Sequence, residues 1–387
     1  MQESPIANGG FTCKRNDHTL PASRSSPRAS IGYSAIVAAI VAAIAEATVA
    51  ASKSLHDVTD PRSPPGAPEM SETILNTALI GCGGRGRGHL ETMKGFDDLR
   101  FVAVCDPVEE LRDRVAAENN VPRKYEEIGD MLAKEELDLA VIATPAHLNG
   151  QCALPVIQAG VHTLLEKPPG LSGAETEGLR DAANTSGAKV LVGWNRRFHS
   201  LICKARGLIE ERGPITQIVA EFHKSMTGLR DRGFPDHLLD NFIYETPIHA
   251  IDLTRSLAGS SPIAELHAVA RRTNSPFVDV YAALIRFENG CVAQLTANFT
   301  TDARLERYEI HGRDCSAYLE GVRKAVVQRD GKTEVFDVVE SGGTAEQARF
   351  LVDCIKDDRP VGLPAAGLDE AVETMKLADR IRAELRD

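Results

Sequence analysis

The sequence is poor in aromatic side chains, which make up 5% of its 387 residues and include a single tryptophan. This scarcity argues against a platform of rings on which bases or glycans would stack. Basic residues are not in excess either, because 44 Lys and Arg stand against 55 Asp and Glu, a formal net charge of −11. Binding of nucleic acid without sequence preference relies on basic side chains at phosphates, so we expect no nucleic-acid partner.

Cysteine pairs and long apolar runs are also missing. The eight cysteines form no C-x-x-C pair and no dense disulfide spacing, which is typical of reduced thiols and predicts a cytoplasmic protein. No group of His, Cys and Asp has the spacing of metal ligands, so we expect no metal. The apolar run at 35–45 is shorter than the roughly 20 residues that span a bilayer, and we expect no membrane association.

A glycine-rich turn follows the first convincing strand. The apolar run at 76–80 leads into GCGGRGRGH, in which Gly81, Gly83 and Gly86 match the pattern G-x-G-x-x-G. Glycine is needed there for a tight turn, for close approach of a pyrophosphate and for packing of the next helix on the strand. The N-terminus of that helix offers free N–H groups to phosphates. The turn therefore predicts a dinucleotide-binding site.

An acidic residue follows at the spacing that such a site requires. Asp106 ends the second apolar run and lies 20 residues past Gly86. A carboxylate there accepts hydrogen bonds from a ribose diol and repels a 2′-phosphate, which favours NAD over NADP. Arg85 and Arg87 in the loop leave NADP as an alternative cofactor. The structural alternative for Asp106 is an N-cap of the next helix.

Two further apolar runs, 137–145 and 161–169, alternate with amphipathic helices, which predicts a doubly wound parallel sheet. The second run ends in Glu166, Lys167 and Pro168. Ligands of such sheets bind at the carboxyl ends of the strands. A lysine placed there beside a nicotinamide and a hydroxyl can stabilise an alkoxide or relay its proton. Taken alone, Lys167 is more typical of a solvated lysine at a strand end.

Five segments form a specific combination: GCGGRGRGH (81–89), VCDP (104–107), ATPAHLNGQCALPVIQAGVHTLLEKP (143–168), VGWNRRF (192–198) and ETPIHAIDLTRSLAG (245–259). Together they resemble the Gfo/Idh/MocA family of oxidoreductases over about residues 74–385. The resemblance implies an N-terminal Rossmann domain and a C-terminal α/β domain with a large, mostly antiparallel sheet. It also implies a homodimer or homotetramer, with NAD as cofactor and NADP not excluded.

The resemblance also implies roles for single residues. Lys167 is implied to be catalytic, and its peptide bond to Pro168 can be cis. His249 is the candidate general acid or base, because a histidine pKa lies near working pH. Glu245, the third implied catalytic residue, stands where the family commonly has aspartate, and it can orient His249 or bind a hydroxyl. The implied cofactor-binding residues are Gly81, Gly83, Gly84, Arg85, Gly86, Asp106, Thr144, Pro145, His147, Glu166, Lys167, Asn195 and Arg197, and the implied substrate-binding residues are Lys167, Tyr244 and Asp252.

The segment around His249 is expected to begin a helix, with Thr246 as its cap and Pro247 in its first turn. Asp252 would share a face with His249 and look across the cleft. Asn149 departs from the family pattern, since relatives often carry histidine there. Residues 226–245 are expected to form a loop that either lines the pocket, with Tyr244, or is simply a flexible surface loop.

The organisation expected from these signals has three parts. Residues 1–70 form a disordered or dispensable leader, with Met70 as a candidate start. Residues 71–195 form the dinucleotide-binding domain. Residues 196–387 bind the substrate and form the oligomer, and the last helices can pack back on the first domain.

The predicted function is an NAD(P)-dependent oxidoreductase acting on a secondary hydroxyl, or the matching carbonyl, of a sugar, cyclitol or related polyol. Three alternatives stay open at this point. The first is an NAD-dependent glycosidase of the same superfamily, although such enzymes alter the lysine that this chain keeps. The others are a methyltransferase and a catalytically silent NAD(P)-binding regulator.

Overall fold

The computed structural model describes residues 74–302, 304–337 and 342–386. The predicted leader and the candidate start at Met70 lie outside these residues. None of the helices within the described ranges is both long and apolar enough to cross a membrane.

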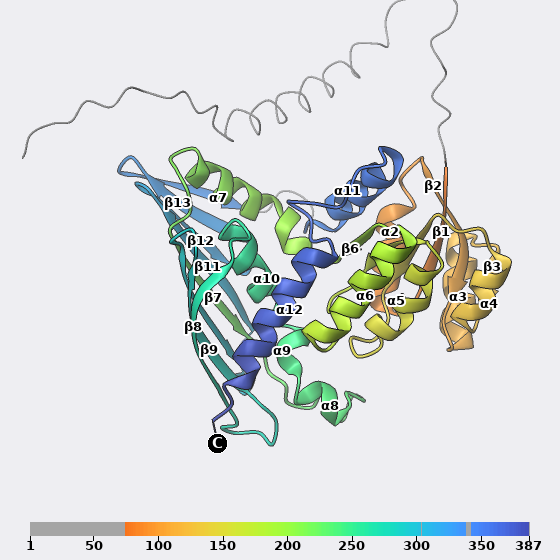
Figure 1. Ribbon diagram of the computed structural model, residues 1–387, viewed down its shortest axis with the longest axis horizontal. Coiled ribbons are helices and arrows are strands. Elements are labelled where there is room, and N and C mark those ends of the chain that lie inside the picture. The colour runs from red at the N-terminus through yellow and green to blue at the C-terminus, as the bar shows by residue number, and fades with distance from the viewer. Residues whose placement is uncertain (1–73, 303, 338–341, 387) are drawn as a thin grey trace, which may run out of the picture. The chain divides into compact units, whose positions relative to one another are not determined.

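The first sheet has six parallel strands in the order β3-β2-β1-β4-β5-β6. Strands β1, β2, β3 and β6 are labelled in Figure 1. Its strands are β1 (Leu75–Ile80), β2 (Leu99–Cys105), β3 (Arg123–Tyr125), β4 (Leu139–Ile142), β5 (His162–Leu165) and β6 (Val190–Val192). Most of them are apolar runs buried on both faces, as parallel strands covered by helices must be. The predicted doubly wound parallel sheet is confirmed. Strand β3 was not expected, because its residues are exposed or half-buried and form no apolar run.

Helices cover both faces of this sheet. Successive residues of one strand point to opposite faces, so Leu79 packs in one apolar cluster and Ile80 in the other. The helices of the Leu79 side are α2 (Gly84–Met93), α3 (Glu109–Asn119) and α11 (Thr344–Lys356). Those of the Ile80 side are α4 (Ile128–Lys134), α5 (Asn149–Gln158), α6 (Gly173–Ser186) and α12 (Leu368–Ala383). The last two helices of the chain thus pack against helices of the first sheet, α11 on α2 and α12 on α6.

The second sheet has eight strands in the order β14-β13-β12-β11-β7-β10-β9-β8. Its strands are β7 (Gln217–His223), β8 (Ile263–Arg271), β9 (Val280–Phe287), β10 (Val292–Asn298), β11 (Leu305–Gly312), β12 (Cys315–Glu320), β13 (Lys324–Arg329) and β14 (Lys332–Asp337). All neighbours pair antiparallel except β7 and β10. The expected large, mostly antiparallel sheet is therefore confirmed.

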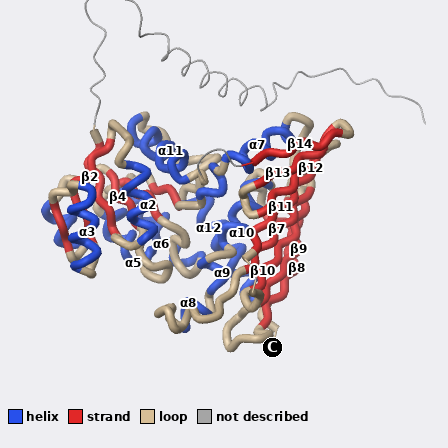
Figure 2. Tube along the Cα trace, turned by 180° about the vertical axis from the view of Figure 1, so that it is seen from behind, coloured by secondary structure: helices blue, strands red, loops and turns tan. Residues whose placement is uncertain are grey.

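Helices lie against one face of the second sheet (Figure 2). Strand β7 alternates buried and half-buried residues, and Ile218, Ala220 and Phe222 point to the helix-covered face. The elements on this face include α7 (Ser200–Glu210), α10 (Ile248–Leu257) and α12. A 3₁₀ helix, η1 (Asn195–Phe198), follows the last strand of the first sheet. We retain the predicted division between residues 195 and 196 as a proposal.

The predicted loop at 226–245 contains two short helices, α8 (Asp236–Leu239) and α9 (Phe242–Glu245). Its apolar residues explain the difference, because Leu239, Phe242 and Ile243 are buried in the core. The segment is therefore not a flexible surface loop throughout. It leads directly into α10, which carries His249.

Candidate active site

A cavity of about 570 Å³ lies at the carboxyl ends of β1, β2 and β4. Ligands of doubly wound sheets bind at this edge. Its walls include seven of the predicted cofactor-binding residues: Gly81, Gly83, Gly84, Arg85, Asp106, Thr144 and Pro145.

The glycines of the first turn are required, or tolerated, for different structural reasons. Gly81 has a φ of +94°, and a Cβ atom there would lie 2.5 Å from the Ala143 carbonyl oxygen. A Cβ on Gly86 would lie 1.9 Å from the Gly81 carbonyl oxygen, so α2 can approach β1 only with glycine at this position. Gly83 and Gly84 instead face open space. Helix α2 begins at Gly84 without a side-chain cap, and this open N-terminus fits a pyrophosphate.

Asp106 lies at the end of β2 beside this turn, with 8% of its surface exposed. Its Oδ2 accepts a hydrogen bond from the Cys82 N–H at 2.7 Å, and its Oδ1 accepts one from the Val108 N–H at 2.9 Å. Helix α3 begins at Glu109 with Val108 in the cap position, so Asp106 is not the N-cap that the alternative required. Its carboxylate ties the glycine turn to the end of β2, and the residue lines the cavity.

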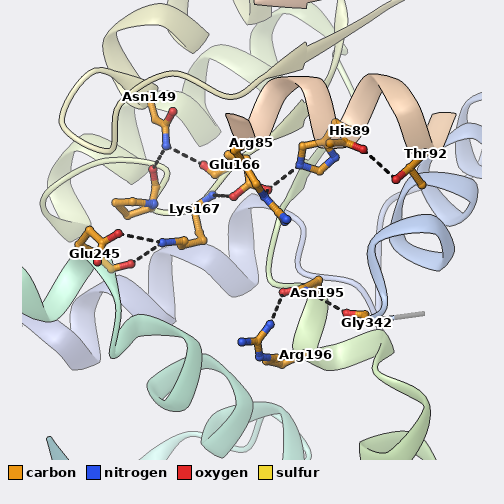
Figure 3. Close-up of polar contacts among 12 residues, drawn as sticks. Arg85, His89, Thr92, Asn149, Glu166, Lys167, Asn195, Arg196, Glu245 and Gly342 are labelled. Carbon is orange, nitrogen blue, oxygen red and sulfur yellow. Dashed lines mark hydrogen bonds and ion pairs between the residues drawn. The ribbon is translucent and has the colours of Figure 1, made fainter. Parts of the chain in front are cut away.

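Glu166 is buried at the end of β5 and is held by two side chains of α2 (Figure 3). Its Oε1 accepts hydrogen bonds from His89 Nε2 and Arg85 Nε, both at 2.6 Å. Burial raises the pKa of Glu166, but the His89 hydrogen bond and the Arg85 charge lower it to about 2. The carboxylate is therefore ionised at neutral pH. Arg85 lies in the first turn of α2 rather than in the loop, and its side chain points to Glu166.

Asn149 holds the backbone on both sides of Lys167. Its Nδ2 donates hydrogen bonds to the carbonyl oxygens of Glu166 and Pro168, each at 3.1 Å. Its Oδ1 accepts a hydrogen bond from Thr144 Oγ1 at 2.8 Å, and the residue is fully buried. The Lys167–Pro168 bond is cis, as the resemblance implied.

The Lys167 ammonium points at Glu245, at the end of α9 (Figure 3). Nζ donates a hydrogen bond to the Glu245 carbonyl oxygen at 2.6 Å and lies 3.5 Å from Oε1. A second ammonium, that of Lys224, lies 3.5 Å from Oε2 of the same carboxylate. Lys224 also donates a hydrogen bond to Thr246 Oγ1 at 3.1 Å. The expected cap by Thr246 is therefore wrong, and Pro247 occupies the N-cap position of α10.

His249 lies in the first turn of α10, four residues after Glu245. Its Nδ1 is buried and has no hydrogen-bond partner in the described part of the chain. Burial lowers the pKa of His249 well below its usual value, and the charges of Arg196, Lys167, Arg85 and Arg304 lower it further. The imidazole is therefore neutral at pH 7 and can accept a proton. Among the described residues, the carboxylate of Glu245 contacts the two lysines and not His249.

The other predicted site residues on η1 and α10 bind partners within the protein. Asn195 Nδ2 donates a hydrogen bond to the Gly342 carbonyl oxygen at 2.6 Å (Figure 3). Arg197 donates two hydrogen bonds to Asp252, at 2.9 and 2.7 Å, and their side chains are 1% and 0% exposed. Because both side chains are almost completely buried, we do not propose that Arg197 contacts the cofactor or that Asp252 contacts the substrate.

Tyr244 and His147 are not among the residues that line the cavity. Tyr244 is 3% exposed, and its hydroxyl donates a hydrogen bond to Asp379 Oδ1 at 2.7 Å. His147 packs edge-to-face on the ring of His237, with ring centroids 5.3 Å apart. Burial and the neighbouring His237 lower the pKa of His147.

Sequence reasoning missed several groups of this site. His89 was unremarked on its helix, although it follows the glycine motif by three residues. Lys224 directly follows β7, and a lysine at a strand end was the available signal. Arg196 donates two hydrogen bonds to Glu306, at 2.7 and 2.9 Å. No sequence pattern joins these two residues, which are 110 positions apart. Within the described residues, no group of three or more His, Cys, Asp or Glu is placed to hold a metal ion.

Two family models match the chain. The oxidoreductase family with an NAD-binding Rossmann fold matches residues 75–194, and the GFO/IDH/MocA C-terminal domain matches residues 203–318. The scyllo-inositol 2-dehydrogenase (NAD(+)) of Bacillus subtilis is 26% identical over 69% of this chain and 80% of its own length. The 4-carboxy-2-hydroxymuconate-6-semialdehyde dehydrogenase of a Sphingobium species is 24% identical over 74% of this chain and 91% of its own length.

The fold is also similar to that of a solved enzyme. The UDP-N-acetylglucosamine 3-dehydrogenase from Acidithiobacillus ferrooxidans superposes with a TM-score of 0.69 and 25% identity, over 80% of this chain and 97% of that one. None of these comparisons supports the glycosidase, methyltransferase or regulator alternatives. Because the two family models together cover more than half of the sequence, the chain belongs to the Gfo/Idh/MocA family of NAD-binding oxidoreductases.

Proposed function

We propose that this oxidoreductase acts on a secondary hydroxyl, or the matching carbonyl, of a sugar, cyclitol or related polyol. The main observation that supports this proposal is the contact between Lys167 and the junction of α9 and α10. The ammonium is bonded to the Glu245 carbonyl, four residues before the neutral His249. A cation and a proton acceptor are the two groups that alcohol oxidation requires at the hydroxyl oxygen.

The chain's own groups fit the cofactor. The open N-terminus of α2 at Gly83 and Gly84 would hold the pyrophosphate, and Asp106 would accept hydrogen bonds from a ribose diol. Thr144 and Pro145 form the wall beside them. When bound, the nicotinamide supplies or accepts the hydride. The carboxylate at position 106 makes NAD our proposed form rather than NADP.

The proton chemistry falls to Lys167 and His249. In the direction of oxidation, the neutral imidazole of His249 accepts the hydroxyl proton, and it returns that proton in the direction of reduction. The Lys167 ammonium donates a hydrogen bond to the same oxygen and stabilises its negative charge. Glu245 fixes the lysine by its carbonyl and its carboxylate. We assign Glu245 a positioning role, because its contacts are with the lysines.

We also propose that the chain forms a homodimer or homotetramer and works in the cytoplasm. Large apolar side chains on the second sheet support self-association, since Val269, Leu284 and Val335 are 45%, 46% and 52% exposed. Light scattering coupled to gel filtration would measure the mass, and a monomer at working concentration would contradict the proposal.

The direct test of the function is a screen of NAD⁺ and NADP⁺ reduction, followed at 340 nm, across sugars, cyclitols and polyols. Their ketones and lactones are tested in reverse with NADH. We expect turnover with NAD⁺ of at least one hydroxyl compound. If the protein bound NADH but turned over no compound, the oxidoreductase proposal would fail and a silent cofactor-binding protein would replace it.

A further inference from the structure

Basic side chains outnumber acidic ones around His249. The charges of four basic residues, Arg85, Lys167, Arg196 and Arg304, act on His249. A fifth, Lys224, contacts the same carboxylate as Lys167, and the described carboxylates paired with this group are Glu166, Glu245 and Glu306. Two of these five basic side chains each form an ion pair with one carboxylate: Arg85 pairs with Glu166, and Arg196 pairs with Glu306. The chain as a whole carries −11, so this local excess is opposite in sign to the rest of the molecule.

The carboxylate of Glu245 contacts two ammonium groups. Lys167 Nζ lies 3.5 Å from Oε1 of Glu245, and Lys224 Nζ lies 3.5 Å from its Oε2. The side chains of the two lysines are 17% and 28% exposed, so an incoming ligand can reach them. One negative charge is shared by two cations, and one positive charge is left over.

Strand pairing brings Arg304 beside Lys224. Strands β7 and β11 pair antiparallel with Leu305 opposite His223 and Glu306 opposite Phe222. Continued one residue beyond this last pair, the register would set Arg304 opposite Lys224. Side chains directly opposite one another share a face of the sheet, and alternate residues return to it. Both basic residues therefore belong to the face of Phe222 and Glu306, which are 1% and 6% exposed. Lys224 is half-buried, and Arg304 is exposed directly before β11.

The surroundings of Lys224 agree with this placement. Its ammonium lies 5.3 Å from the ring centroid of Phe242, next to the α9–α10 junction. Burial lowers the pKa of Lys224; Glu245 opposes that shift, and the charges of Lys167 and Arg304 add to it. The Lys224 ammonium is half-buried, and its burial beside other cations is costly unless an anion binds there.

We infer that the substrate carries an anionic group, a carboxylate or a phosphate ester, which Lys224 and Arg304 bind while its hydroxyl faces His249. The inference rests on the proposed function and narrows its substrate to an acidic sugar or polyol. The cofactor's phosphates do not explain the surplus, because they belong at the α2 N-terminus, whereas Lys224 and Arg304 come from the second sheet.

The test uses the full chain with NAD⁺ and matched sets of compounds. Each neutral sugar is compared with its uronate, its aldonate and its 6-phosphate, which separates a carboxylate from a phosphate ester. We expect at least one acidic member to show a kcat/KM about tenfold or more above its neutral parent. The advantage should shrink as salt is added, because screening weakens charge pairing. Equal or better turnover of the neutral parents would overturn the inference and leave the proposed function standing.

Variants test the two residues directly. Lys224→Met and Arg304→Met should each lower the acidic-to-neutral ratio of kcat/KM about tenfold, mainly through KM for the acidic compound. Arg286→Met is the matched control, because it removes one positive charge from an exposed pair with Glu265 on the same sheet. An unchanged ratio in both variants would overturn the inference.

If no compound turns over, calorimetry separates the two failures. Gluconate and glucose 6-phosphate are titrated onto the NADH complex beside glucitol and glucose. Tighter binding of an acidic compound, lost in Lys224→Met, would support the anion site although the proposed reaction had failed. Binding of the acids no tighter than of the neutral compounds would overturn the anion site as well.

Discussion

At the scale of residues, the proposed chemistry depends on two side chains from different parts of the chain. Lys167 is held at the end of β5 and His249 in the first turn of α10. We expect Lys167→Met and His249→Ala each to cut turnover by about 10² or more, because each removes a proton-handling group at the hydroxyl. NADH affinity should change little, since the pyrophosphate cradle is untouched. Steady-state rates and NADH fluorescence titration measure the two effects.

The control for these variants is Lys94→Met, which removes an exposed lysine paired with Glu91 on α2. It should retain wild-type turnover. Wild-type turnover in both Lys167→Met and His249→Ala would contradict the assigned chemistry.

The pH dependence follows from the depressed pKa of His249. Burial and four nearby cations lower this pKa well below its usual value. The neutral, proton-accepting form therefore persists on lowering the pH, and protonation occurs only below the ordinary histidine range near pH 6.5. We expect kcat/KM for alcohol oxidation to stay level from neutral pH through about pH 6.5 and to fall at lower pH. A pH–rate profile with its acidic limb centred above pH 7 would contradict this environment.

Asn149 is a positioning residue for Lys167, because one amide binds the carbonyls of both neighbours. We expect Asn149→Leu to lower kcat about tenfold while NADH affinity changes less than threefold. The two carbonyls would also lose their buried donor, at a cost of roughly 1–3 kcal/mol in folding free energy. The split between kcat and NADH affinity distinguishes positioning from a general loss of structure.

The matched control is Asn119→Leu, which removes a side-chain bond to the Val115 carbonyl on α3. It should retain the wild-type kcat. If Asn149→Leu were less stable but had a wild-type kcat, Asn149 would be structural only.

At the scale of elements, helix α2 contains three glycines at alternate positions with different surroundings. A Cβ on Gly86 would collide with the Gly81 carbonyl oxygen, whereas a Cβ on Gly88 meets nothing within 4 Å. We expect Gly86→Ala to destabilise the fold by about 1–3 kcal/mol, as overpacking does, and to weaken NADH binding at least tenfold. Gly88→Ala should stabilise it by about 0.5–1 kcal/mol, because alanine is the better helix former. Thermal unfolding and NADH titration compare the two, and equal behaviour would contradict the packing of α2 on β1.

The elements that sequence could predict are those with a strong local signal. Strands β1, β2, β4 and β5 are apolar runs ending in turns, and the glycine spacing fixed the place of α2. Strand β3 was not predicted, because its three residues are exposed or half-buried and carry no such signal. The helices α8 and α9 have four residues each, too short for a helical period to emerge.

Contacts between distant segments could not be read from the sequence. Lys167 and Glu245 are 78 positions apart, and Glu306 lies 110 positions from Arg196. The pairing of β7 with β11 decides which side chains share the site, and register across such a distance leaves no local pattern. The motifs therefore predicted Lys167, His249 and Glu245 as site residues, but not the contact of Lys167 with Glu245 or the second lysine at that carboxylate.

At the scale of the whole molecule, both sheets contribute to the site. The first supplies the glycine turn, Asp106 and Lys167 at the carboxyl ends of its strands. The second supplies Lys224, and α10, which packs against that sheet, supplies His249. The bond from Lys167 to the Glu245 carbonyl joins the two sets of groups. In the proposed reaction, a cofactor held at the first sheet would meet a substrate held at the second.

The most direct test of this arrangement is a titration of the full chain with NADH, followed by the fluorescence of the nicotinamide. The account predicts saturable binding with a Kd below about 1 mM, retained in Lys167→Met and weakened in Gly86→Ala. If neither the oxidised nor the reduced nucleotide, with or without the 2′-phosphate, associated at about millimolar concentration, the account would be contradicted.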